Sequence, residues 1–230
     1  MSSPPIELLP ALVARRVAGV DEVGRGCLAG PVYAAAVILP PRCRIRDLDD
    51  SKKLAPDKRQ EVAARVRDRA LAWAVGRAEV EEIDQVNILR ATFLAMRRAL
   101  AQLVPLPTEC WVDGNQDPGL GLPVRMIVGG DALEACIMAA SVVAKVARDD
   151  EMTRLCMQHP GYGFSQHKGY GTPLHLEALR RLGPSPIHRR SFAPCAQAQF
   201  TFATVGALAG AAVPPVSIES GDWESEAACL

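Results

Sequence analysis

Three short apolar runs in this chain each stop at glycine and an acidic residue, and this pattern constrains the fold most. The first run, 17–20, leads into Asp21 and Glu22. The other two runs precede Asp113 and Asp131. Such runs predict buried β-strands, so acids at their ends lie at the rim of the core rather than in open solvent. If these strands form one sheet and end at one edge, the four carboxylates meet in one cleft.

Four carboxylates in one cleft would need cations beside them. Two like charges about 4–5 Å apart repel by roughly 3–4 kcal/mol at an effective dielectric constant near 20. Magnesium prefers oxygen ligands of this kind, and two divalent ions would offset four negative charges. The pattern therefore predicts a two-metal site that holds Mg²⁺ or Mn²⁺.

A glycine-flanked arginine follows the first acid pair in the turn Gly24-Arg25-Gly26. Glycine lets the main chain approach a ligand closely, and a guanidinium group binds phosphate well. Acids beside such a turn indicate metal-dependent chemistry on a phosphodiester.

The order of predicted elements is typical of an α/β protein, rich in strands early and in helices late. Strands are expected at 17–20, 32–39 and 71–80 and at two short runs that end at Asp113 and near Asp131, and helices at 56–70, 81–103, 133–157 and 173–182. Thr172 is expected to cap the last helix, which Gly183 ends. We interpret 1–16 as a leader, 17–200 as the catalytic domain and 201–230 as a mobile acidic tail.

Length and composition agree with an ordinary globular enzyme. The 230 residues suit one domain, and hydrophobic residues make up 49% of them. No apolar run reaches the ~18 residues of a membrane helix, and no secretory signal is visible. Seven cysteines without a Cys-x-x-Cys pair argue against disulfides and zinc and for a reducing, cytoplasmic location.

The net charge of zero hides an uneven distribution. Residues 201–230 carry four acids and no base, so the remaining chain has 26 bases against 22 acids. Residues 141–200 hold eight bases and four acids. A nucleic-acid substrate suits this balance because phosphates need cationic contacts, although such a charge run by itself is more often a solvated face.

Ordered motifs resemble those of the bacterial ribonuclease HII family across most of the chain, from about residue 17 to residue 194. They are 19–26 (GVDEVGRG), 50–54 (DSKKL), 87–89 (NIL), 112–115 (VDGN), 130–131 (GD), 139–146 (AASVVAKV), 162–164 (YGF), 167–170 (HKGY) and 188–192 (HRRSF). The resemblance implies a ribonuclease H-like fold, with a mixed five-stranded sheet flanked by helices and a helical C-terminal region. It also implies a type 2 ribonuclease H.

The resemblance implies an activity and a set of site residues. The enzyme would cut the RNA strand of RNA–DNA hybrids and nick duplex DNA 5′ of embedded ribonucleotides, leaving 3′-hydroxyl and 5′-phosphate ends. The catalytic, metal-holding carboxylates would be Asp21, Glu22, Asp113 and Asp131. The substrate would contact Gly24, Arg25, Gly26, Lys52, Lys53, Lys145, Lys168 and Tyr170. A monomer acting on such duplexes, away from membranes, is expected.

Two of these assignments have rivals in the sequence. Asp149, within the long predicted helix, competes with Asp131 for the fourth carboxylate position, and the resemblance favours Asp131. Tyr162 competes with Tyr170 as the tyrosine that packs on the sugar following the ribonucleotide. Asp21 and Glu22 are also neighbours on a strand, so they point to opposite faces unless the strand ends or twists there.

Three other functions remain as alternatives. A ribonuclease HIII-like enzyme would carry an extra N-terminal domain and a glutamate on the later helix. An inactive module that binds hybrid duplexes would have lost one or more of the carboxylates. A transposase-like strand-transfer enzyme shares the acidic cleft, but the Gly-Arg-Gly and Lys-Gly-Tyr elements do not suit it.

Overall fold

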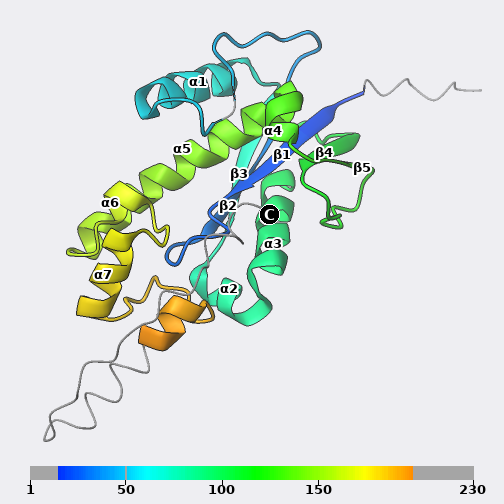
Figure 1. The fold of residues 1–230 in the computed structure, drawn as a ribbon. Helices are drawn as coiled ribbons and strands as arrows, with labels where there is room; N and C mark the ends of the chain where they lie inside the picture. Colours follow the sequence, from blue (N-terminus) through cyan, green and yellow to red (C-terminus); the bar gives the residue numbers. More distant parts are fainter. Residues whose placement is uncertain (1–14, 50, 199–230) are drawn as a thin grey trace, which may run out of the picture.

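A mixed five-stranded sheet forms the centre of the molecule, as Figure 1 shows. The computed structural model describes residues 15–49 and 51–198, so the predicted tail 201–230 and residues 1–14 of the leader lie outside the described residues. The strand order is β3-β2-β1-β4-β5; β1, β2 and β3 pair antiparallel, whereas β4 and β5 run parallel to β1. The strands are β1 (Val17–Val23), β2 (Val32–Ile38), β3 (Ala72–Ala78), β4 (Glu109–Asp113) and β5 (Val124–Ile127).

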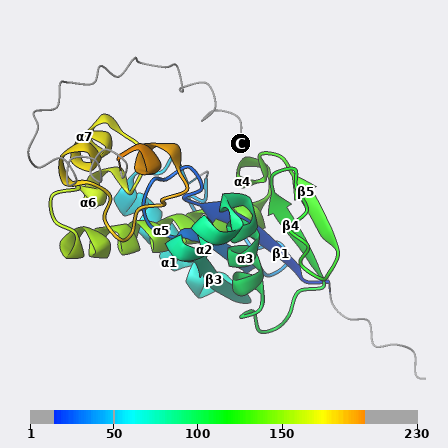
Figure 2. The ribbon, with the colours of Figure 1, turned by 90° about the horizontal axis from the view of Figure 1, so that it is seen from below.

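Helices cover both faces of the sheet (Figures 1 and 2). The helices are α1 (Pro56–Arg69), α2 (Val80–Val86), α3 (Ile88–Leu100), α4 (Gly130–Leu133), α5 (Ala135–Gln158), α6 (Phe164–His167) and α7 (Pro173–Leu182). α3 packs on one face, and α5 with α1 packs on the other. Within the described ranges, no helix combines the length and the apolarity that a membrane crossing needs.

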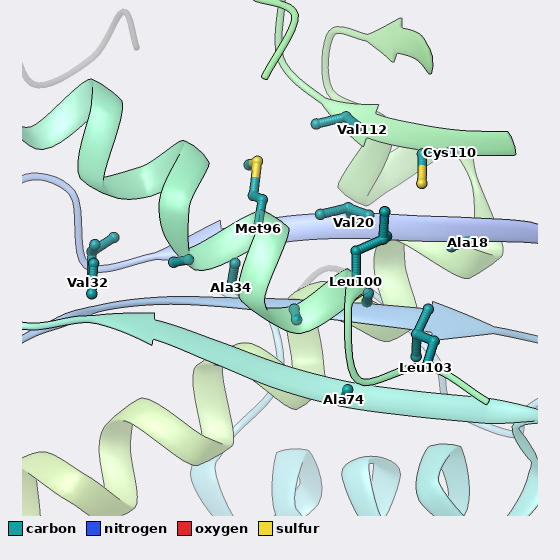
Figure 3. Close-up of a cluster of buried hydrophobic side chains, with 14 of the residues drawn as sticks. Ala18, Val20, Val32, Ala34, Ala74, Met96, Leu100, Leu103, Cys110 and Val112 are labelled. Carbon is teal, nitrogen blue, oxygen red and sulfur yellow. The ribbon is translucent and has the colours of Figure 1, made fainter. Parts of the chain in front are cut away.

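Two apolar layers result from this arrangement, and β2 contributes to both because all seven of its residues are buried. The layer between the sheet and α3 includes Val20, Met96, Leu100 and Val112 (Figure 3). Strands buried on both faces lose the alternation of polar and apolar residues, which is why β2 reads as a continuous apolar run.

Gly19 allows α5 to begin directly against β1. A Cβ atom at this position would lie 2.1 Å from the carbonyl carbon of Cys136, in the first turn of α5. Any side chain would therefore push the helix away from the strand, and with it the residues that α5 places near Asp21.

One of the expected helices is divided in the structure, so the prediction of a single helix over 81–103 was wrong. Asn87 has a φ of 69° and separates α2 from α3, and its side chain accepts a hydrogen bond from the Arg90 amide to cap α3. The apolar spacing continues across Asn87, so periodicity alone did not reveal this break. The helix expected over 133–157 is confirmed as α5, which begins at Ala135 after the extended Glu134.

The last expected helix is confirmed as α7. The Thr172 side chain accepts a hydrogen bond from the His175 amide, and Gly183 ends the helix with a φ of 74°. α6 and α7, with a further helical stretch over 193–198, pack at the far end of α5 and form the predicted helical C-terminal region (Figure 1).

Side chains from α3 and its C-terminal end cover the outer edge of β3. The guanidinium of Arg98 donates to the Arg77 carbonyl at 2.8 Å, and the amide of Gln102 donates to the Val75 carbonyl at 3.1 Å. These backbone oxygens would otherwise face solvent as unpaired acceptors at the edge of the sheet.

Candidate active site

The end of β1 is open on one side, and this opening creates the candidate site. The pairing of β1 with β4 stops at Val20, opposite Val112, whereas its pairing with β2 continues to Val23. Asp21 and Glu22 therefore lie within β1 rather than after it, just beyond the last paired residue of β4. Asp113, the final residue of β4, is next to this opening.

Asp21 is 5% exposed and is held by neighbouring polar groups. Its Oδ1 accepts the Glu22 amide at 2.7 Å, and it hydrogen-bonds to the Ser141 side chain, whose hydroxyl lies 2.9 Å from that of Ser51. Burial, together with the negative charges of Glu22 and Asp113, raises the pKa of Asp21 well above its ordinary value. The ionised form of Asp21 is therefore disfavoured in the folded protein.

Glu22 is the next residue of β1, and it also interacts with Asp113. Burial raises its pKa and the charge of Asp113 raises it further, while the guanidinium of Arg25, 3.3 Å from Oε1, lowers it. Although strand neighbours point to opposite faces, Asp21 and Glu22 both interact electrostatically with Asp113 because β4 ends beside them.

Asp113 links this pair to Asp131. Its Oδ1 accepts the amide of Gly130 at 2.7 Å, at the start of α4. Burial raises the pKa of Asp113, and the charge of Asp131 raises it further. Asp131 is 9% exposed, and the ammonium of Lys52 lies 3.5 Å from its Oδ2.

Asp149, the rival for the fourth position, is engaged elsewhere. Its carboxylate oxygens contact the Arg59 guanidinium at 3.4 Å and the Lys145 ammonium at 2.9 Å. The structure therefore brings Asp131, rather than Asp149, to Asp113. This arrangement joins four acidic side chains in a chain of interactions, in the order Glu22, Asp21, Asp113 and Asp131.

The four carboxylates offer hard oxygen donors, which suit Mg²⁺ or Mn²⁺. Among the described residues, no group of three or more His, Cys, Asp or Glu side chains is arranged closely enough to hold a metal ion. Arg25 lies 3.3 Å from Glu22, and Lys52 lies 3.5 Å from Asp131. Burial raises the pKa values of Asp21, Glu22 and Asp113, and neighbouring negative charges raise them further, so a bound cation would stabilise their ionised forms.

Two fully buried arginines support the Gly-Arg-Gly turn. Arg189 donates to the carbonyl oxygens of Gly24 and Arg25, both at 2.7 Å, and to that of Gly30. Arg148 lies against Gly24, which has a φ of 93°, and a Cβ atom there would be 2.1 Å from its Nε. With its carbonyls held from beneath, the turn is fixed against the protein.

Gly26, in contrast, faces open space. Apart from its chain neighbours, no described atom lies within 4 Å of the position that a Cβ would take there. Packing therefore does not require the second glycine of the turn.

Tyr170 lies beside this turn through a bridge between its backbone and that of Cys27. It is 39% exposed, and the Lys145 ammonium lies 5.8 Å from its ring centroid. Burial of its hydroxyl end raises the pKa to about 12, so the phenol stays protonated at neutral pH. Tyr162 is buried, and its hydroxyl donates to the Gly183 carbonyl at 2.7 Å, so it serves the C-terminal packing.

The predicted lysines do not form one cluster. Lys52 lies beside Asp131, and Lys145 lies between Asp149 and Tyr170. Lys168 donates to the Thr153 hydroxyl at 2.8 Å, and Lys53 lies 3.6 Å from Asp49. Of the four, Lys52 is the one that the structure brings to the carboxylates.

Sequence reasoning missed several residues that build the site. They are Ser51, Ser141, Arg148, His175, His188 and Arg189. Three of them, Ser141, His188 and Arg189, lie in the segments 139–146 and 188–192, which had carried the resemblance without a role being given to these positions.

Comparisons with known proteins agree with this architecture. The family model described as Ribonuclease HII matches residues 18–195. A ribonuclease HII from Bordetella pertussis is 56% identical over 186 residues, which cover 81% of this chain and 90% of that relative.

Two solved structures extend the agreement to the fold. Ribonuclease H2 from Pyrococcus horikoshii OT3 matches with a TM-score of 0.70 at 28% identity, covering 82% of this chain and 99% of that one. Ribonuclease HII from Archaeoglobus fulgidus, solved in a PCNA complex, matches with a TM-score of 0.67 at 26% identity, covering 77% and 95%. The fold is ribonuclease H-like, as the resemblance implied. With its sequence, sheet and acidic strand ends in agreement, the chain belongs to the ribonuclease HII family and is a metal-dependent endonuclease of the ribonuclease H class.

Proposed function

We propose that this enzyme cuts the RNA strand of RNA–DNA hybrids and nicks duplex DNA on the 5′ side of embedded ribonucleotides. The products would carry 3′-hydroxyl and 5′-phosphate ends. The observation that carries the proposal is the approach of Asp21, Glu22 and Asp113 at the open end of β1, with Asp131 beside Asp113, where burial and neighbouring negative charges raise the pKa values of the first three. The duplex substrates would be bound by a monomer.

Asp21, Glu22, Asp113 and Asp131 would hold two Mg²⁺ or Mn²⁺ ions. When bound, such ions supply Lewis-acid activation of a water and neutralise charge at the leaving 3′-oxygen. The carboxylates would fix the positions of the cations, and Ser141 would hold the Asp21 side chain by a hydrogen bond. Water would attack the phosphorus directly, so no covalent intermediate would form.

Recognition of the ribonucleotide is assigned to the Gly24–Gly26 turn and Tyr170. A 2′-hydroxyl both donates and accepts a hydrogen bond, which distinguishes RNA from DNA. The open space at Gly26 would admit the sugar to the backbone of the turn, and the exposed side of Tyr170 would pack on the following sugar. Arg25, Lys52, Lys53, Lys145 and Lys168 would contact phosphates.

A reducing, cytoplasmic location suits the proposed enzyme. The cysteines within the described ranges are all free thiols: Cys27, Cys43, Cys110, Cys136, Cys156 and Cys195. Burial raises the pKa of Cys110 to about 12, so its thiol is unreactive at neutral pH.

The first experiment uses a labelled DNA duplex with a single ribonucleotide, incubated with Mg²⁺, Mn²⁺ or EDTA. An all-DNA duplex is the control. We expect a metal-dependent nick just 5′ of the ribonucleotide and none in the control. Cleavage confined to long RNA stretches would contradict the proposed junction sensing and favour a ribonuclease HIII-like activity. Binding without any nick would contradict the whole assignment.

Two glycine variants separate recognition from folding. Gly26→Ala adds a methyl group where the protein has room, so the melting temperature should hardly change while nicking falls at least about tenfold, a barrier increase of ~1.4 kcal/mol. Gly24→Ala adds the same methyl group against Arg148 at a positive φ, so it should destabilise the fold itself. Unchanged nicking by Gly26→Ala would contradict sugar approach at this turn.

A further inference from the structure

A chain of hydrogen bonds runs through the C-terminal region to the backbone of Tyr170. The Ser185 amide lies 2.9 Å from Nδ1 of His188, and Nε2 of His188 lies 3.0 Å from Nε2 of His175. Nδ1 of His175 then lies 2.9 Å from the carbonyl oxygen of Tyr170. His175 and His188 are both fully buried.

The donor and the acceptor of each hydrogen bond in this series follow from the backbone groups at its two ends. A backbone amide can only donate, so Nδ1 of His188 accepts from Ser185 and its proton resides on Nε2. His188 therefore donates to Nε2 of His175, which leaves the His175 proton on Nδ1. From there it donates to the Tyr170 carbonyl, which can only accept. Every member has one permitted protonation state, and each imidazole is neutral.

Neutrality of both imidazoles agrees with their surroundings. Burial lowers the pKa of His175 to about 4 and that of His188 to about 3, well below the ordinary value near 6.5. In the part of the chain that the structure describes, no group of three or more His, Cys, Asp or Glu side chains could hold a metal ion, so these two histidines belong to none. The pair is therefore a structural connection rather than a ligand set.

The same short segment also holds the Gly-Arg-Gly turn. His188 forms a backbone bridge to Ala29, and its neighbour Arg189 donates to the carbonyls of Gly24 and Arg25. Arg189 thus connects this segment to the turn, and His188 connects it, through His175, to Tyr170. The relative position of the two sugar-recognising elements is set from a single point in the chain.

We propose that His175 and His188 are positioning residues that set Tyr170 against the Gly-Arg-Gly turn and so determine the preference for a ribonucleotide followed by DNA. This inference rests on the proposed role of Tyr170 at the sugar. The Thr172 amide also donates to the Tyr170 carbonyl, at 2.8 Å, so the turn remains closed when His175 is changed and only its orientation is released.

Two substitutions of His175 separate its two hydrogen bonds. Asn places its amide where Nδ1 stood and keeps the donation to Tyr170, whereas Gln places its oxygen where Nε2 stood and keeps only the acceptance from His188. We expect His175→Gln to lower the ratio of nicking at one ribonucleotide to cleavage of a long hybrid about fivefold to tenfold. His175→Asn should keep this ratio within about twofold, although both variants lose one buried hydrogen bond of similar strength.

Combining His175→Gln with Tyr170→Ala tests whether His175 acts on the ratio through Tyr170. If His175 acts through Tyr170, His175→Gln has no additional effect on the ratio in the Tyr170→Ala enzyme. Equal ratios for the Asn and Gln variants, or an additive effect in the double variant, would overturn the inference. An unchanged ratio in Tyr170→Ala alone would overturn it together with the role of Tyr170. A reduced ratio there with wild-type behaviour of His175→Gln would overturn the inference and leave the proposed function standing.

An independent readout is the ¹⁵N spectrum of the histidine rings in the wild-type protein. We expect a proton on Nδ1 of His175 and on Nε2 of His188 at neutral pH. The opposite assignment at either ring would contradict the direction of the chain, whatever the cleavage assays show.

Discussion

Two regions of this protein bury polar groups, and they do so with opposite results. At the end of β1, Asp21 and Asp113 are buried beside other acids, and their pKa values are raised. In the C-terminal region, Arg189 donates to three carbonyl oxygens and His175 has a partner at each ring nitrogen. The difference teaches that buried groups with complete hydrogen bonding hold distant segments together, whereas buried like charges leave a site that a cation would stabilise.

The strongest way to break this comparison is to change a carboxylate at the incomplete end. Asp113→Asn keeps the shape and removes a charge, so we expect cleavage to fall by at least about 10³-fold, or ~4 kcal/mol of barrier. Because a repulsive charge is lost, the melting temperature of the metal-free protein should stay the same or rise. Asp117→Asn, on an exposed loop, serves as the matched control, and near-normal cleavage by Asp113→Asn would remove Asp113 from the site.

Substitution of Arg189, in the completed network, should appear mainly as a loss of stability. Arg189→Lys replaces a planar group that donates to three carbonyl oxygens with an ammonium that does not reproduce this geometry, so buried carbonyl acceptors such as that of Gly30 lose hydrogen bonds. At ~1–3 kcal/mol for each such group, the free energy of unfolding should fall by about 3 kcal/mol in urea titrations. Arg190→Lys, at the exposed neighbouring position, should change it by less than about 0.5 kcal/mol. Equal effects at the two positions would show that the buried network does not contribute.

Metal addition sharpens the same contrast. A cation that binds the folded carboxylates but not the unfolded chain stabilises by about 2.7 kcal/mol at a hundred times its dissociation constant. Manganese should therefore raise the melting temperature of the wild-type protein relative to EDTA, and much less that of Asp113→Asn. An equal rise in both proteins would place the bound metal elsewhere.

The smallest expected effect is in pH dependence. The folded pKa values of His175 and His188 lie below the unfolded value near 6.5, so their contribution to stability is complete above ~6.5 and is lost as the pH falls toward ~4. Each contributes no more than about 1.4 kcal/mol per pH unit in that window. The raised pKa values of the buried carboxylates make stability rise as the pH falls, which is the opposite direction. The pH dependence of wild-type stability alone therefore does not isolate the histidines.

The difference between two proteins isolates the histidine contribution. Urea unfolding of wild type and of His175→Gln, measured between about pH 7.5 and about pH 5, should show a steeper loss of stability on acidification in wild type. Parallel curves would mean that His175 is not held neutral by its surroundings.

Much of the fold could be predicted because strand ends leave a mark in the sequence. The runs before Asp21, Asp113 and Asp131 are strands of one sheet, as the pattern of apolar residues and glycines indicated. The break at Asn87 could not be predicted in the same way, because the apolar spacing of the two helices continues across it. The assignment of the four carboxylates as metal ligands stays a prediction.

The buried arginines and histidines were missed for a physical reason. Arg148 and Arg189 bind backbone carbonyl oxygens, which every residue carries, so no complementary acid in the sequence marks their partners. His175 and His188 lack zinc-type spacing in the sequence, and the structure uses them as hydrogen-bonding links between segments. Such contacts become visible only when the fold has brought distant backbone atoms together.

The covered edge of β3 has a consequence for how this enzyme behaves at high concentration. An edge strand of seven residues with bare acceptors would invite a second copy to extend the sheet. Here Arg98 and Gln102 already occupy the Arg77 and Val75 carbonyls, so an incoming strand would have to displace them. These two side-chain contacts thereby oppose fibre-like self-association at this edge of the sheet.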